Sequence, residues 1–132
     1  DAHQTSKSCK CFTQESAEQF ELKARKIDWN ENKIELIKDA ICLHMNGFSD
    51  NSYSEEATLL QQGASCDVIG EQLHTIPKHI KQQILEQYPR NEFNKTFIEL
   101  IRLEGKSNPH SRTAFLAKLG LPLMIYLNPY KS

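Results

Sequence analysis

The chain has 132 residues, of which 39% are hydrophobic and 25% are charged, and its formal net charge is −1. This length and composition are typical of one globular domain with an apolar core, and they exclude a disordered or fibrous protein. The 16 Lys and Arg residues are interspersed with 17 Asp and Glu residues, so we expect no basic face for nucleic acid. No apolar run approaches the roughly 18 residues of a membrane span, and we predict no span.

The chain begins with a polar tail that we place at residues 1–12. The tail contains Cys9 and Cys11, separated by one lysine, and we expect it to be poorly ordered until these cysteines anchor it. The chain opens on small polar residues without Met, as is typical after cleavage of a signal peptide. Together with the even number of cysteines, this opening favours an exported protein, secreted or periplasmic.

One helical domain is predicted over residues 13–132, and helical spacing of apolar residues begins directly after the tail. Four of them step by three or four positions: Ala17, Phe20, Ala24 and Ile27. This spacing predicts a first helix over about residues 13–26. The second helix is predicted to begin at a capping box of Asp28 and Glu31 and to end at Gly47.

Two short helices are predicted in the middle of the chain. The first covers about residues 55–62, begins with the pair Ser52 and Glu55, and ends at Gly63. The second covers about residues 66–73.

Three more helices are predicted after residue 73. Thr75 caps the first, which carries Pro77 in its first turn; Asn91 opens the second, which Gly105 ends; and Asn108 opens the third. Their inward residues follow from the apolar period: Ile76, Ile80, Ile84 and Tyr88, then Phe93, Phe97, Leu100 and Ile101, then Phe115 and Leu119.

Together these elements predict an all-α fold, a single irregular bundle of six or seven short helices. Neither a strand pair nor a hairpin turn is indicated by the sequence. The apolar run at residues 121–127 is the one segment for which a strand is an alternative.

The four cysteines predict two disulfides that staple the bundle. Cys9 and Cys11 are too close in sequence to bond each other without strain, so we expect each to pair with one of Cys42 and Cys66, in a connectivity that stays open. Closing such a loop stabilises the fold by about 3.5–4 kcal/mol in the chain-entropy model. A zinc site and a redox site are the alternatives, although the chain has neither paired C-x₂₋₄-C knuckles nor a C-x-x-C motif.

Two further sites are indicated by short motifs. Asp1, Ala2 and His3 have the form of the amino-terminal copper site known from serum albumin, in which nitrogen ligands hold Cu(II) or Ni(II) in a square plane. The alternative is a solvated tail. Asn94 begins an Asn-Lys-Thr acceptor sequence for N-glycosylation in a eukaryotic source. No resident cofactor is predicted.

No catalytic motif is found, and we predict that the protein is not an enzyme. The sequence contains no nucleophile elbow, metalloprotease helix, phosphate-binding loop or dinucleotide fingerprint. Aromatic residues in the loop after the second helix and at the carboxyl end are instead candidates for contacts with an unidentified protein partner: Phe48, Tyr53, Tyr126 and Tyr130. A second copy of the chain is an alternative occupant, so a homodimer stays open.

The leading hypothesis is a small exported helical protein that binds another protein, as an inhibitor, an immunity protein or an effector. In size, helix content and cysteines the chain resembles the helical periplasmic immunity proteins that block secreted bacterial amidases, a likeness of build that assigns no residue. The alternative is an extracellular carrier that holds a small apolar ligand in a helical cavity. An enclosed apolar cavity of roughly 300 Å³ or more favours the carrier, and an exposed apolar patch favours the binder.

Overall fold

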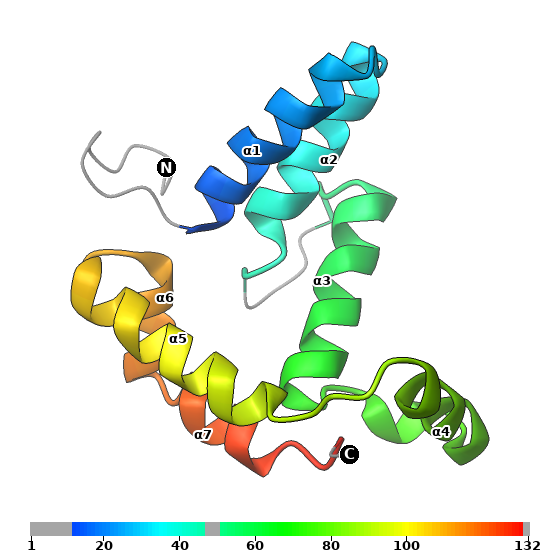
Figure 1. Cartoon of the computed structure of the whole chain (residues 1–132), viewed down its shortest axis with the longest axis vertical. Coiled ribbons are helices and arrows are strands. Elements are labelled where there is room, and N and C mark those ends of the chain that lie inside the picture. The colour runs from blue at the N-terminus through cyan, green and yellow to red at the C-terminus, as the bar shows by residue number, and fades with distance from the viewer. Residues whose placement is uncertain (1–11, 47–50, 131–132) are drawn as a thin grey trace. The chain divides into compact units, whose positions relative to one another are not determined.

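The computed structural model describes residues 12–46 and 51–130 of the chain. These ranges contain seven α-helices, one 3₁₀ helix and no strand (Figure 1), which confirms the predicted all-α class. None of these helices is long and apolar enough to cross a membrane. The chain divides into two compact units, one up to Ala64 and one from Ser65. The tail boundary at residue 12 and the single domain over residues 13–132 stay predictions.

The first unit is built on two helices, α1 (Phe12–Lys26) and α2 (Glu31–Leu43), which lie side by side in Figure 1. Small residues are buried where they meet, and small residues let two helix axes approach closely. The buried apolar residues of the pair are Ala17, Ala24, Ile34 and Ala40. Across the turn between the helices, the rings of Phe20 and Trp29 meet edge to face with centroids 5.9 Å apart. The predicted helix over residues 13–26 is therefore confirmed.

The start of α2 differs from the predicted capping box. Asp28 has a φ of 53° and lies in the turn, so it does not cap the helix. Asn30 is the N-cap, and its side chain accepts hydrogen bonds from the backbone N–H groups of Asn32 and Lys33. Asp and Asn are equally good N-caps by type, so the left-handed conformation at Asp28 decides which of them serves. The predicted end at Gly47 lies outside the described residues.

α3 (Glu55–Ile69) is one continuous helix, whereas the sequence predicts two helices with a break at Gly63. A glycine inside an exposed helix costs about 1 kcal/mol relative to alanine, which the rest of a long helix offsets. Ser54 accepts a hydrogen bond from the backbone N–H of Ala57 in the first turn of the helix, at 3.1 Å. The helix ends at Gly70, whose φ of 77° is left-handed, the usual conformation after a helix.

A short 3₁₀ helix, η1 (Leu73–Thr75), and α4 (Lys78–Gln87) follow. Thr75 belongs to η1 and does not cap α4, because its hydroxyl donates to a backbone carbonyl of the preceding turn at 2.8 Å. α4 contains no buried residue. Ile80 and Ile84 of its predicted inward stripe are 37% and 41% exposed.

The core of the second unit lies where three helices meet: α5 (Phe93–Ser107), α6 (Arg112–Lys118) and α7 (Leu121–Leu127). Ile101 of α5 and Ile125 of α7 are buried there. The run at residues 121–127 is therefore a helix, and the strand alternative is wrong.

The sequence predicts that Gly105 ends α5. In the structure α5 continues to Ser107, and Gly105 lies at the contact between α5 and α6. A Cβ built on Gly105 would lie 3.6 Å from the Cα of Ala114, so the two backbones approach closely at this point. α6 accordingly packs with Ala114 inward, while Phe115 and Leu119 are 60% and 64% exposed. The prediction that these two large residues face inward is wrong, because the close contact selects the small face of the helix. Ser111, rather than Asn108, is the N-cap of α6.

In the part of the chain that the structure describes, no disulfide connects two helices. Cys9 and Cys11 lie outside the described residues. Cys42 on α2 and Cys66 on α3 are both partly buried and are not bonded to each other. The pairing of the four cysteines therefore stays a prediction.

Candidate functional site

Arg90 organises a polar network in the second unit. Its side chain, between α4 and α5, is 7% exposed and forms an ion pair with Asp67 at the end of α3. The guanidinium donates to Oδ1 of Asn94 at 3.1 Å. It also lies over the rings of Phe93 and Tyr130, 4.6 and 5.1 Å from their centroids. Ion pairing and cation–π contact both stabilise a buried guanidinium, so Arg90 fixes the start of α5 and the carboxyl-terminal segment to the end of α3.

Asn128 makes the second connection to the end of α3. Its side chain is fully buried. Nδ2 donates to the carbonyl oxygens of Asp67 and Val68, at 2.7 and 3.0 Å, and Oδ1 accepts from the N–H of Tyr130 at 2.8 Å. The last carbonyls of a helix lack hydrogen-bond donors within the helix. The Asn128 amide is the donor for two of these carbonyls in α3. A Cβ at Gly70 would lie only 2.8 Å from Oδ1 of Asn128, so this approach requires glycine.

Two titratable groups near this network are held in their neutral forms. Burial raises the pKa of the Tyr130 phenol, and the Asp67 carboxylate raises it further. Burial, again followed by Asp67, raises the pKa of the Cys66 thiol. The thiol form of Cys66 is therefore favoured over the thiolate.

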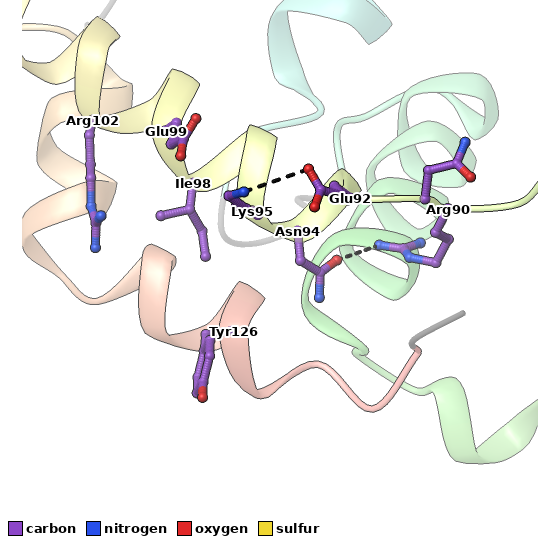
Figure 2. Close-up of a pocket in the computed structure, with 9 residues that line it drawn as sticks. Arg90, Glu92, Asn94, Lys95, Ile98, Glu99, Arg102 and Tyr126 are labelled. Carbon is purple, nitrogen blue, oxygen red and sulfur yellow. Dashed lines mark hydrogen bonds and ion pairs between the residues drawn. The ribbon is translucent and has the colours of Figure 1, made fainter.

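An open groove of about 590 Å³ lies between α5 and α7 (Figure 2). Most of its lining comes from α5 and the residues just before it, and Tyr126 comes from α7. The lining residues are Arg90, Asn91, Glu92, Asn94, Lys95, Ile98, Glu99, Arg102 and Tyr126. Charged side chains of both signs therefore line the groove together with the apolar parts of Ile98 and Tyr126.

A second open groove, of about 470 Å³, lies on another side of α5. Phe93 and Phe97 line it with their rings stacked 5.2 Å apart, and Leu100, which is 54% exposed, continues it. Of the four residues of α5 predicted to face inward, only Ile101 is buried. α5 thus carries more apolar surface than the second unit covers.

Six large apolar side chains of α6 and α7 are exposed in the described chain, and we call this set the α6–α7 surface. Its six side chains are 47–65% exposed: Phe115, Leu119, Leu123, Met124, Tyr126 and Leu127. With six large side chains exposed to about one half to two thirds, several hundred Å² of apolar surface is accessible to a partner.

Of the four aromatic residues predicted to contact a partner, the structure places one on an exposed surface. Tyr126 is 65% exposed and belongs to the α6–α7 surface. Tyr130 is 8% exposed, because its ring packs on Arg90, and it does not belong to such a surface. Tyr53 is partly buried, and its hydroxyl accepts a hydrogen bond from Asn46. Phe48 lies outside the described residues.

The predicted glycosylation residue, Asn94, has a structural role in the described chain. It is partly buried, and its Nδ2 donates to the carbonyl oxygen of Ile125 at 3.0 Å. A glycan would be attached to the same nitrogen, and would compete with this contact between α5 and α7. Modification of Asn94 stays a prediction.

The predicted metal ligands Asp1, Ala2 and His3 lie outside the described residues. Within the described ranges, no group of three or more His, Cys, Asp or Glu side chains could hold a metal ion. His44 is partly buried, its Nδ1 lies 2.6 Å from the carbonyl oxygen of Ile41, and its ring meets Phe12 edge to face. His44 therefore has a structural role at the end of α2.

Comparison of the chain with protein-family models, with curated proteins and with solved structures gives no match. We therefore infer function from the geometry of the second unit. The two residues that organise this unit, Arg90 and Asn128, are not predicted from the sequence. The available signal is weak: Arg90 follows a proline, and Asn128 is the one polar side chain between Leu121 and Pro129 apart from a tyrosine.

Proposed function

We propose that the protein is exported and acts by binding another protein, as an inhibitor, an immunity protein or an effector, without catalysing a reaction. The α6–α7 surface carries this proposal, because its six large apolar side chains are 47–65% exposed. Exposed apolar surface of several hundred Å² is typical of binding sites. A standard interface takes roughly 800 Å² from each partner, so a partner also contacts residues around these six.

The buried polar contacts next to α7 support the same proposal. Arg90 and Asn128 connect α5 and the segment after α7 to the end of α3 through buried ion-pair and hydrogen-bond contacts. A surface held in its bound shape loses less conformational entropy when a partner binds. The network is therefore suited to a surface that binds without rearrangement.

The form of the two described grooves favours a binder over a carrier. A carrier encloses its ligand among apolar side chains, whereas both grooves are open. The larger one is lined by five charged residues: Arg90, Glu92, Lys95, Glu99 and Arg102. Neither of these two grooves therefore encloses a ligand as a carrier's cavity does.

Two disulfides are part of the proposed exported form, with Cys9 and Cys11 each bonded to one of Cys42 and Cys66. Cys42 and Cys66 lie on different helices and are partly buried, as is usual for cysteines in structural bridges. Mass spectrometry of unreduced protein from its native compartment tests this part. We expect the mass to be lower than that of the reduced chain, because each of the four thiols loses one hydrogen when two disulfides form. Four free thiols would contradict export.

A capture experiment with matched variants tests the binding function. Full-length tagged protein is incubated with an extract of its native source, in parallel with the double variant Leu123→Glu and Leu127→Glu and with the control Leu59→Glu. Leu59, on α3, is 68% exposed, so the control adds a charge at an equally exposed leucine. We expect a stoichiometric partner that the wild type and the control retain and the double variant loses. Equal recovery by all three, with circular dichroism unchanged, would contradict the assignment to α6 and α7.

A further inference from the structure

Four charged residues on α5 and its N-cap form a stripe that the proposed function does not use. They are Glu92, Lys95, Glu99 and Arg102, and all four are exposed. Their spacing of three, four and three places them on one side of the helix. We call this set the charged stripe. It forms the α5 wall of the groove between α5 and α7, as Figure 2 shows.

The charges of the stripe alternate in sign along the helix. When the stripe is turned end to end, each of its positions carries the opposite charge. In an antiparallel pair of α5 helices centred at position 97, Glu92 lies opposite Arg102 of the second copy. Lys95 then lies opposite Glu99 of the second copy. Two-fold symmetry repeats both pairs with the copies exchanged, so every charge in the stripe meets the opposite charge. A parallel arrangement in register places like charges together and is disfavoured.

We propose that the protein forms a two-fold homodimer in which the charged stripes of two copies pair antiparallel, each α5 filling the groove of the other. This interface goes beyond the proposed function, since it uses the groove and leaves most of the α6–α7 surface accessible. Ile98 and Tyr126 also line the groove, and Tyr126 is 65% exposed, so the second α5 covers apolar side chains as well as charges. Lys95 pairs with Glu92 of its own helix at 3.6 Å, but the side chains are 68% and 74% exposed and stay accessible.

The expected dimer is weak and sensitive to salt. Exposed ion pairs contribute little each and are screened by ions, so they determine the register and orientation of the helices more than the strength of association. We expect dissociation constants in the micromolar range or above, and weaker association at about 0.5 M NaCl than at about 0.05 M NaCl. A dimer formed through the apolar α6–α7 surface would show the opposite or no dependence on salt.

Charge reversal tests the pairing in the full-length protein by sedimentation velocity. Lys95→Glu sets two carboxylates against each other across the interface, and Glu99→Lys sets two ammonium groups against each other. Each variant alone is therefore expected to associate at least about tenfold more weakly. Mixing the two variants restores both pairs across the interface, and we expect a heterodimer of wild-type affinity. An effect within one helix cannot be rescued by mixing, which separates pairing from a change in helix stability.

Lys118→Glu is the matched control, because it makes the same charge change on α6, outside the stripe. It is expected to leave dimerisation unchanged, and circular dichroism checks that every variant is folded. A wild-type protein that remains monomeric at millimolar concentration would overturn the proposal. So would a dimer that both reversals leave intact, or a mixture that associates no better than the separate variants. The reciprocal pair Glu92→Lys and Arg102→Glu gives an independent repeat of the mixing test.

Discussion

Replacing Asn128 by alanine removes the side chain that connects the end of α3 to the carboxyl-terminal segment. Three hydrogen bonds are lost, to the carbonyls of Asp67 and Val68 and from the N–H of Tyr130, at a side chain that is fully buried. Each buried group left without a partner costs about 1 kcal/mol or more. Water reaches some of the freed groups in the variant, so we expect a loss of about 2–4 kcal/mol in the free energy of unfolding.

Urea unfolding followed by circular dichroism measures this loss. Asn32→Ala is the control, since Asn32 is exposed on α2 and its truncation is expected to change the free energy of unfolding by less than about 0.5 kcal/mol. Asn128→Asp is expected to be at least as destabilising as Asn128→Ala, because it places a carboxylate against two carbonyl oxygens. A loss below about 0.5 kcal/mol for Asn128→Ala would refute the reasoning that this side chain fixes the segment after α7.

Three further predictions concern backbone geometry and charge. Gly70→Ala is expected to lower the free energy of unfolding by about 3 kcal/mol and Gly120→Ala by only about 1–2 kcal/mol. Both glycines have positive φ, but of the two only Gly70 has other atoms within 4 Å of a built Cβ. Equal losses in the free energy of unfolding, measured in urea, would contradict this reasoning. At Gly105, alanine is expected to be tolerated, while leucine costs about 1–3 kcal/mol by separating α5 from α6, again measured in urea. Hydrogen bonds, chiefly from Lys38, lower the pKa of Glu21. The Glu21 carboxylate therefore stabilises the α1–α2 pair fully at a pH above the ordinary pKa of Glu, and this stabilisation is lost as the pH falls through the lowered pKa. Glu21→Gln should therefore reduce the acid-induced fall in melting temperature, and an unchanged pH profile would contradict the role of this carboxylate.

The helical class follows from the sequence because apolar periodicity is a property of many residues at once, whereas helix ends depend on single backbone conformations. Gly63 and Gly105 are equally good stop signals by residue type, yet both lie inside helices. Gly70 and Gly120, which have positive φ, stand at actual ends. The sequence does not distinguish these two classes of glycine, because the φ angle of each is determined by contacts that form only in the folded chain.

The exposed surface is harder to predict than the helices for a related reason. A pattern of large apolar residues indicates which face of a helix is apolar, but not whether the fold covers it. Gly105 and Ala114 meet closely, and this contact turns Phe115 and Leu119 outward. The sequence therefore predicts Phe115 and Leu119 as core residues, although the structure exposes both. Of the four aromatic residues predicted to contact a partner, Tyr126 belongs to the α6–α7 surface.

Cross-linking mass spectrometry of the protein in its native complex tests the central claim, binding through α6 and α7, most directly. Lys118 is an exposed lysine of α6 next to Leu119, and Lys23 is an exposed lysine of α1. The account predicts that cross-links from Lys118 to a second, different protein outnumber those from Lys23. Cross-links to another protein that concentrate at Lys23, or a native protein that cross-links to no other protein, would contradict it.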